Sequence, residues 1–225
     1  MQKSFKYYDI ILAVFAAVLL ISNLAGTKLI AFGPITTDGG AVLFPLAYIL
    51  GDVLTETYGY KYTRRAIWAA FGIMLLAVAA FTVVRYMPPA PEYTAQASYE
   101  AVLGFFPRIV VASLAAFLTG SFLNSFVLAK LKVKTKGEKL WLRLIGSTFV
   151  GEFFDTVVFA LVAFGGILQG TGMLVYILIG WLFKTGVEVV CLPITYRVIA
   201  KMKQIENIDT YDNKTDFTPF RVDLD

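Results

Sequence analysis

Three pairs of ionisable residues lie inside apolar stretches of the chain, each at a spacing that puts both members on one face of a helix. They are Asp52 with Glu56, Glu152 with Asp155, and Lys184 with Glu188. A charged side chain costs roughly 2.5 to 3.5 kcal/mol in hydrocarbon on insertion scales, so such groups normally face a bundle interior and mark the path of a polar solute or ion. The three pairs therefore predict a protein that binds or moves a polar solute within a membrane.

The second pair has the fewest structural explanations. Glu152 lies eleven residues beyond Trp141, which is roughly 16 Å along a helix at 1.5 Å per residue and close to the middle of a bilayer. No basic residue lies within one helical turn of Glu152 or Asp155. These two carboxylates need a partner helix, protons or a ligand that donates hydrogen bonds.

The other two pairs have structural alternatives to a binding role. Lys184 and Glu188 either brace the bundle as an intrahelical ion pair or face the two acidic helices. Asp52 and Glu56 either contact a ligand or lie partly in solvent, because they fall toward one end of their apolar stretch. The spacing alone leaves both alternatives open.

The apolar stretches that carry these residues are long enough to cross a membrane. Hydrophobic residues make up 58% of the chain and charged residues 16%, and the mean hydropathy is +0.70. Soluble domains have about 25% charged residues. We expect one all-α membrane domain over residues 1–203, a cytoplasmic tail over 204–225, and no cleavable signal peptide. The six predicted spans are 8–30, 41–59, 66–87, 108–130, 141–168 and 172–200.

Basic residues gather at alternate ends of these spans. One side holds four clusters, whereas the other side has only Arg85 and Arg108 near the span ends. The positive-inside rule then places both termini in the cytoplasm. The clusters are Lys3 and Lys6; Lys61, Arg64 and Arg65; Lys130, Lys132, Lys134, Lys136, Lys139 and Arg143; and Arg197, Lys201 and Lys203.

Several chemistries lack the residues they require. The chain has no histidine and a single cysteine, Cys191, so zinc and haem sites lack their usual ligands, and we expect neither a metal nor a cofactor. No phosphate-binding Gly-x-x-x-x-Gly-Lys-Ser/Thr loop is present, which argues against ATP hydrolysis by this chain. No basic motif interleaved with aromatic residues indicates nucleic-acid binding. An intramembrane hydrolase that uses lysine or paired carboxylates stays open.

A weak internal repeat accompanies the acidic pairs. Asn23 and Asn124 are 101 residues apart, and Gly51-Asp52 and Gly151-Glu152 are 100 apart. The two asparagines either join helices or contact a ligand. Three spans per half give the halves opposite topology, which predicts an inverted-repeat transporter with a site at the bilayer midplane.

Four motifs distributed over nearly the whole chain resemble the YhhQ-type queuosine precursor transporter family, whose members are vitamin uptake transporter-like. That resemblance implies a six-helix inner-membrane importer of 7-cyano-7-deazaguanine and 7-aminomethyl-7-deazaguanine for salvage into the tRNA base queuosine. The motifs are Leu43-Phe44-Pro45-Leu46-Ala47-Tyr48 with Gly51-Asp52-x2-Thr55-Glu56; Trp141-x-Arg143 with Gly151-Glu152-x2-Asp155-Thr156; Lys184-x3-Glu188-x4-Pro193; and Glu206-x2-Asp209-x-Tyr211-Asp212 with Phe217-Thr218-Pro219-Phe220.

The residues are compatible with such a purine-like substrate. A carboxylate of Glu152 or Asp155 can accept hydrogen bonds from the N–H and amine edge of the ring, and Lys184 can donate to a ring carbonyl. Aromatic rings can stack on the base. The full candidate set is Asn23, Asp52, Glu56, Asn124, Glu152, Asp155, Lys184 and Glu188, with Phe44, Tyr48 and Phe153 as stacking residues.

Other classes of protein and modes of transport stay open beside a secondary transporter. The rivals are the intramembrane hydrolase and a substrate-binding subunit that depends on an external ATPase. The expected partners are the small-molecule substrate and the lipid bilayer, with no nucleic acid, and a homodimer is left open. Facilitated and proton-coupled movement both fit the buried carboxylates, because burial favours their protonated form.

Overall fold

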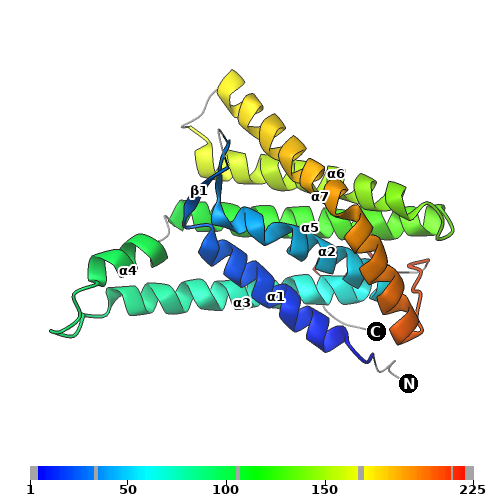
Figure 1. Cartoon of the computed structure of the whole chain (residues 1–225), viewed down its shortest axis with the longest axis horizontal. Helices are drawn as coiled ribbons and strands as arrows, with labels where there is room; N and C mark the ends of the chain where they lie inside the picture. The colour runs from blue at the N-terminus through cyan, green and yellow to red at the C-terminus, as the bar shows by residue number, and fades with distance from the viewer. Residues whose placement is uncertain (1–4, 33–34, 105–106, 167–169, 214, 221–225) are drawn as a thin grey trace.

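The structure is a computed structural model, and it describes residues 5–32, 35–104, 107–166, 170–213 and 215–220 of the chain (Figure 1). A 3₁₀ turn, Gly39–Val42, precedes α2, and a π-helical turn, η2 (Leu54–Tyr58), follows it. Two short antiparallel strands, β1 (Leu29–Phe32) and β2 (Ile35–Asp38), form a hairpin after the first helix. The α-helices are α1 (Tyr8–Ala25), α2 (Phe44–Val53), α3 (Tyr60–Tyr86), α4 (Gln96–Leu103), α5 (Pro107–Lys134), α6 (Leu140–Phe164) and α7 (Thr171–Glu206).

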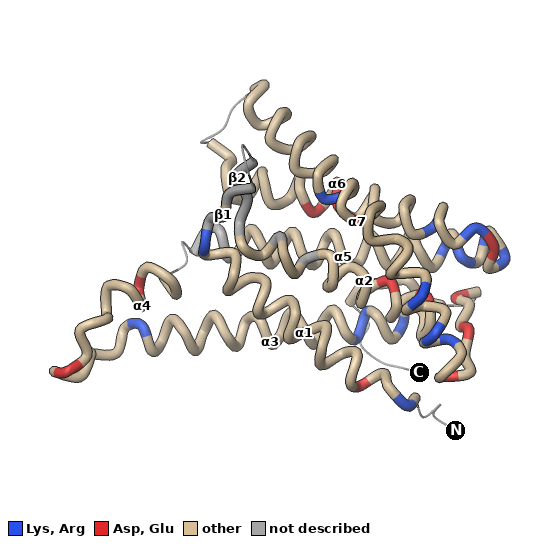
Figure 2. Tube along the Cα trace, viewed as in Figure 1, with Lys and Arg blue, Asp and Glu red and all other residues tan. Residues whose placement is uncertain are grey.

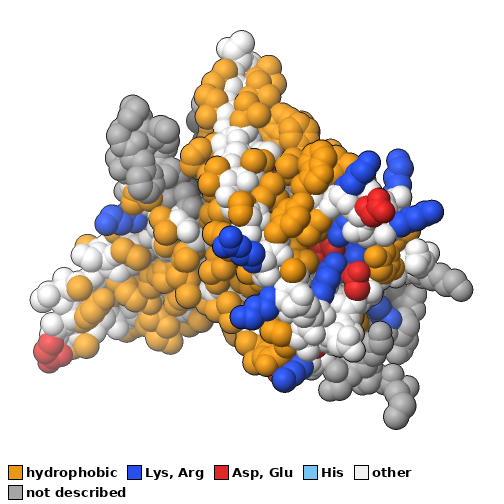
Figure 3. All heavy atoms as spheres, turned by 45° about the vertical axis from the view of Figure 1, so that its right-hand side comes forward, with side chains coloured by type: hydrophobic (Ala, Val, Ile, Leu, Met, Phe, Trp, Pro, Cys, Tyr) orange, Lys and Arg blue, Asp and Glu red, His pale blue; other side chains and the backbone are white. Residues whose placement is uncertain are grey.

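Within the described ranges, five helices are long and apolar enough to cross a membrane, namely α1, α3, α5, α6 and α7. Their outward faces carry large apolar side chains, such as Leu76 on α3 and Ile179 and Val190 on α7, all of which are exposed. Hydrophobic side chains cover much of the face drawn in Figure 3, while lysines and arginines gather at one end. Lipid is the environment in which such a surface is stable. The predicted helical membrane protein is therefore confirmed at this level.

The segment 41–59, predicted as one span, has a more broken structure than expected. It consists of α2, with 10 residues, and η2, with 5, which together rise roughly 22 Å if 1.5 Å per residue is used. In the π turn the carbonyl oxygen of Glu56 accepts a hydrogen bond from Lys132 Nζ at 2.5 Å. That lysine supplies a donor for a carbonyl within the wider turn.

Two other segments also differ from the prediction. The first span was expected to reach residue 30, but α1 ends at Ala25 and the chain turns into the β-hairpin, whose closing bond joins Gly39 N to the Lys28 carbonyl at 2.8 Å. The hairpin makes the fold less purely α-helical than expected. The connection after α3 contains a further helix, α4, which packs beside α3 through a hydrogen bond from Gln96 to the Arg85 carbonyl at 3.2 Å.

Helices α5 and α6 approach each other closely through two glycines. A Cβ atom placed on Gly120 would lie 2.7 Å from Asp155 Cβ, and one on Gly151 would lie 2.8 Å from Asn124 Cβ. Small residues allow this approach of two backbones in a membrane bundle. The contact places Asn124 of α5 and Asp155 of α6 at the interface between these two helices.

The two ends of the described chain meet. The backbone N–H groups of Lys6 and Tyr7 donate to the Glu206 carboxylate at 3.0 and 2.7 Å, and Tyr58 Oη donates to it at 2.8 Å. The first turn of α1 therefore obtains an acceptor from the last turn of α7. The start of α1 and the end of α7 therefore lie at the same end of the bundle.

Residues beyond α7, which were predicted as a cytoplasmic tail, lie against α3. Asp212 accepts a hydrogen bond from the Tyr60 N–H at 3.1 Å, at the N-terminus of α3. Arg64 donates to the carbonyl oxygens of Asp216 and Thr218, and Trp68 donates to the Pro219 carbonyl at 2.7 Å. The described part of the tail is thus packed structure.

Candidate functional site

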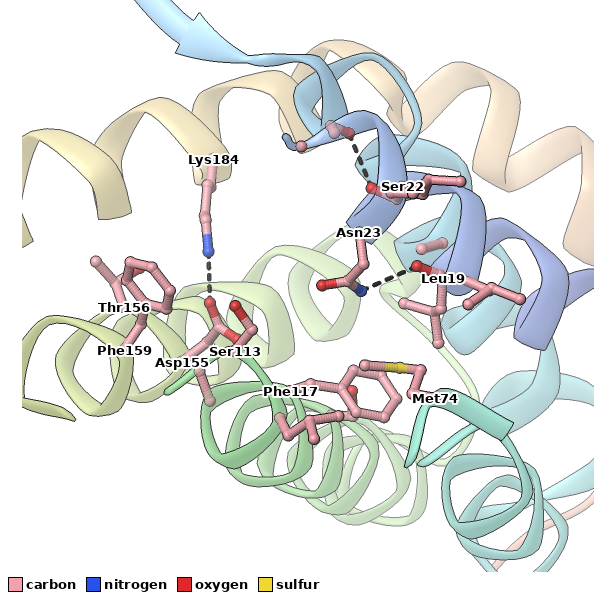
Figure 4. A pocket seen from close by; sticks show the side chains of 18 of the residues that line it. Leu19, Ser22, Asn23, Met74, Ser113, Phe117, Asp155, Thr156, Phe159 and Lys184 are labelled. Atoms are coloured by element: carbon pink, nitrogen blue, oxygen red, sulfur yellow. Dashed lines mark hydrogen bonds and ion pairs between the residues drawn. The ribbon is translucent and has the colours of Figure 1, made fainter. Parts of the chain in front are cut away.

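A cavity of about 1310 Å³ lies between the helices (Figure 4). It exceeds the roughly 300 to 1,000 Å³ that is usual for small-molecule sites, so it can serve as a vestibule as well as a binding pocket. Its walls on α5, α6 and α7 come from 113–125, 155–164 and 172–184. On α6 and α7 these segments lie in the halves away from the joined chain ends, whereas on α5 they span the middle of the helix and on α3 the lining reaches Thr63, near the beginning of that helix.

Lys184 on α7 connects to both acidic residues of α6. Its Nζ donates a hydrogen bond to Asp155 Oδ2, drawn in Figure 4, and lies 3.2 Å from Glu152 Oε2. The Glu152 side chain is fully buried, whereas Asp155 and Lys184 border the cavity. The alternative in which Lys184 faces an acidic helix is the one found. The partner helix required by Glu152 and Asp155 is α7.

Glu188, one turn further along α7, is bonded elsewhere. Its Oε1 accepts a hydrogen bond from Thr148 Oγ1 of α6 at 2.6 Å. The side chain is 5% exposed. The ion pairs of Lys184 therefore run between helices, and the intrahelical brace with Glu188 is not among the ion pairs of the described residues.

Glu152 keeps unused hydrogen-bonding capacity. The Lys184 ammonium pairs with Glu152 Oε2 at 3.2 Å, whereas Glu152 Oε1 has no donor among the described residues. The neighbouring Thr156 hydroxyl is also buried without a partner there, and Thr156 borders the cavity. Unsatisfied buried acceptors are expensive unless a ligand, a proton or water meets them.

Asp52 and Asn124 join α2 to α5. Asn124 Nδ2 donates to Asp52 Oδ1 at 3.0 Å, and both side chains are buried. Asn124 Oδ1 and Asp52 Oδ2 have no donor among the described residues. Asn124 thus joins two helices and also borders the cavity, so its position is compatible with both expected roles, the contact between helices and the contact with a ligand.

Asn23 lies across the cavity from the Lys184–Asp155 pair, as Figure 4 shows. Its Nδ2 donates to the Leu19 carbonyl of its own helix at 2.9 Å. The structure therefore brings Asn23, Asn124, Asp155 and Lys184 to one cavity, with Glu152 buried behind them.

Glu56 lies in a different environment. It is fully buried and accepts hydrogen bonds from Arg143 Nε, from Arg143 Nη2 at 3.0 Å and from Lys203 Nζ at 2.9 Å, while Lys132 Nζ lies 3.5 Å away. Figure 2 shows these charges gathered at the end of the bundle where the chain ends meet. Glu56 is not among the cavity-lining residues. Glu56 and Asp52 have different partners, although both contact α5.

Asp209 extends this ion cluster from the segment after α7. Its Oδ1 lies 2.6 Å from Lys132 Nζ and 2.8 Å from Lys203 Nζ. Burial raises the pKa of the Asp209 carboxyl, but the hydrogen bonds and positive charges of the two lysines outweigh that effect and hold the pKa below its usual range. We define the ion cluster as Glu56, Lys132, Arg143, Lys203 and Asp209.

The predicted stacking residues have different surroundings. Tyr48 borders the cavity. Phe153 packs against the Trp181 ring at 5.1 Å between centroids and is not among the cavity-lining residues, and the side chain of Phe44 lies outside the described part of the chain. The cavity instead presents Phe117 and Phe159, labelled in Figure 4. With 19 phenylalanines in the chain, no sequence signal distinguishes these two.

Comparison with known proteins agrees with the sequence motifs. A family model described as "Putative vitamin uptake transporter" matches residues 38–198. The chain is 32% identical over 187 residues to the "Probable queuosine precursor transporter" of Bacillus subtilis (strain 168), which covers 83% of this chain and 80% of that protein. It is 29% identical over 128 residues to the "Queuosine precursor transporter" of Escherichia coli (strain K12), covering 57% and 55%.

No solved structure matches the chain. The family match extends over most of the chain and includes Asp52, Glu56, Asn124, Glu152, Asp155, Lys184 and Glu188. The resemblance read from the motifs is confirmed, and the chain belongs to the vitamin uptake transporter family.

Proposed function

We propose that this protein imports 7-deazaguanine precursors of queuosine, with 7-cyano-7-deazaguanine and 7-aminomethyl-7-deazaguanine as substrates. The names of the two relatives support this substrate class. The observation that carries the proposal is the Lys184–Asp155 bridge at the cavity, with the buried carboxylate of Glu152 directly behind it. Membership of a transporter family supports a role other than catalysis and argues against the hydrolase.

The polar groups of the cavity match the edges of a guanine-like ring. Such a ring presents an N–H and an exocyclic amine side by side, and a carboxylate accepts from two such donors at once. Asp155 offers its carboxylate at the cavity wall, Glu152 Oε1 lies unpaired behind it, and Lys184 can turn a donor toward the ring carbonyl while it stays near Asp155. Phe117 and Phe159 supply faces for stacking. Binding of the substrate then supplies hydrogen-bond partners to buried polar groups that lack them.

The arrangement of cavity and ion cluster suits alternating access. On α6 and α7 the cavity lies in the helix halves away from the chain ends, and the buried ion cluster lies at the end where the chain ends meet. With both termini in the cytoplasm, as the positive-inside rule favours, this form is open toward the outside of the inner membrane and closed toward the cytoplasm. Segment α2–η2 serves as the sixth crossing, and the two halves act as inverted repeats.

The test is uptake of labelled 7-cyano-7-deazaguanine into proteoliposomes that contain only this chain. Uptake without any ATPase excludes a subunit that needs an ATP-driven partner. Glu152→Gln keeps the shape of the side chain but removes the charge and one acceptor. A hydrogen bond to a charged group is worth about 1.5 to 3 kcal/mol, so we expect affinity to fall roughly 10- to 150-fold.

The matched control is Glu92→Gln, which changes an exposed carboxylate in the connection after α3 and should leave affinity unchanged. Size-exclusion profiles of each variant separate lost binding from lost folding. Near-normal affinity in Glu152→Gln and in Asp155→Asn would remove these residues from the proposed site. Absence of uptake by the native chain, with folding intact, would contradict the transport proposal itself.

A further inference from the structure

The buried polar layer between the cavity and the ion cluster contains more acids than bases. Its described ionisable groups are four carboxyls and a single ammonium. Lys184 pairs with the two carboxyls of α6, and Glu188 interacts with the neighbouring carboxyls. With every carboxyl ionised, the layer would carry a net charge of −3 in the middle of the bundle. Such an excess is too costly in a low-dielectric interior. The groups are Asp52, Glu152, Asp155, Glu188 and Lys184.

Two of these carboxyls lie together. Asp52 of α2 and Glu188 of α7 are within hydrogen-bonding reach of each other, at 0% and 5% exposure. Each has one oxygen already occupied: Asp52 Oδ1 by Asn124 at 3.0 Å and Glu188 Oε1 by Thr148 at 2.6 Å. The remaining oxygens, Asp52 Oδ2 and Glu188 Oε2, have no donor among the described residues.

A carboxyl pair of this kind is satisfied by one shared proton. Two ionised carboxylates have no donor to offer each other, whereas one protonated member donates to its neighbour and removes one negative charge. The groups that surround the pair cannot replace that proton. Asn124 from α5 and Thr148 from α6 already donate to the other oxygens, Glu152 and Glu56 are acidic, and the ammonium of Lys184 is bonded to α6.

We propose that the Asp52–Glu188 pair binds one proton and couples substrate import to the proton gradient. This inference rests on the proposed function. The pair joins α2 to α7, so a movement that separates these two helices breaks the shared hydrogen bond and leaves a lone carboxyl that water can reach. The proton then leaves from that carboxyl to cytoplasmic water as a hydrated proton, and both carboxylates stay ionised in contact with water. When the protein returns to the form open to the outside, the pair takes up one proton from external water and closes again.

A direct test observes the shared proton without any substrate. Infrared spectra of the purified protein at neutral pH should contain a stretch from a protonated carboxyl, and Glu188→Gln and Asp52→Asn should each remove the same component. Both amides can donate the hydrogen bond that the proton supplies, so the variants should fold. Glu92→Gln should leave the component in place. A spectrum that keeps the full band in both amide variants overturns the proton site.

The coupling test measures accumulation of neutral 7-cyano-7-deazaguanine in proteoliposomes whose membrane potential is held at zero. With one proton per substrate and the outside one pH unit more acidic, the native chain should concentrate substrate about tenfold. Glu188→Gln should give an inside-to-outside ratio of about one. A native ratio of one, with uptake still present, overturns the coupling but leaves the transport proposal intact. Absence of uptake in the native chain contradicts the proposed function, while the infrared test still decides the proton site.

Discussion

Removal of the Glu56 charge should be among the most destabilising single changes in this protein. Glu56 is fully buried and interacts with the cationic groups of Arg143, Lys132 and Lys203. Glu56→Gln keeps the size of the side chain but leaves Lys132 and Lys203 with Asp209 as their only carboxylate partner among the described residues, and Arg143 with none. Arg143 and Lys132 are each only 2% exposed, so solvent does not compensate for the loss.

The expected magnitude follows from that burial. Breaking a buried ion pair by removing one partner costs about 3 to 5 kcal/mol. The lower value corresponds to a decrease of roughly 150-fold in the folding equilibrium constant. Reversible unfolding in mixed detergent, followed by tryptophan fluorescence, measures the difference against the native chain. Glu92→Gln is the control, because a change at an exposed position should stay within about 0.5 kcal/mol.

A second substitution separates charge imbalance from lost packing. Glu56→Gln together with Lys203→Gln restores the net charge of the ion cluster, so part of the lost stability should return. Lys203 is the most suitable partner, because its side chain is 20% exposed and tolerates a polar amide. A Glu56→Gln protein that unfolds like the native chain would refute the reasoning, as would a double variant less stable than the sum of the two single changes.

Three further predictions concern other parts of the molecule. Gly151→Ala should lower stability by about 1 to 3 kcal/mol in the same unfolding assay because its Cβ meets Asn124, whereas Gly186→Ala, with nothing within 4 Å, should not; equal effects would contradict the close α5–α6 contact. Asp209 has a lower pKa in the folded protein than its unfolded pKa near 3.9, so its ionised form stabilises the fold above that pH, and the stability is lost as pH falls through the folded pKa. The Asp209→Asn variant should therefore lose less stability than the native chain on acid titration. An unchanged stability profile would contradict the prediction. Lys136→Cys, in a background without Cys191, should react only from the cytoplasmic side; labelling from outside intact cells would overturn the orientation.

The sequence predicts the helices well because apolar length is a local property. Four spans were expected close to where α3, α5, α6 and α7 lie, since a run of about 20 apolar residues has few alternatives to a helix in lipid. The exceptions are local as well. The two strands of the hairpin at 29–38 pair with each other, whereas the π turn of η2 has a partner from another helix, the side chain of Lys132.

Partners were harder to predict than positions. The spacing of Lys184 and Glu188 shows that they share a helix face, but it does not show which helix lies opposite that face. The partner Asp155 is 29 residues away on α6. Asp52 and Glu56 were expected on one face of an α-helix, but their spacing does not show that Asp52 bonds to Asn124 while Glu56 enters the ion cluster. The roles of the candidate residues in binding stay predictions.

The contacts made by the end of the chain have a consequence for its synthesis. The amide groups at the start of α1 and α3 find their acceptors on Glu206 and Asp212, and Asp212 follows Tyr60 by 152 residues. At roughly 5 to 20 residues per second, the ribosome reaches Asp212 about 8 to 30 s after Tyr60. During that time the first helices are already inserted with open ends. Completion of these contacts therefore waits until residues 206–212 have been synthesised, and a chain that stops before residue 206 lacks the acceptors for the amide groups at the start of α1 and α3.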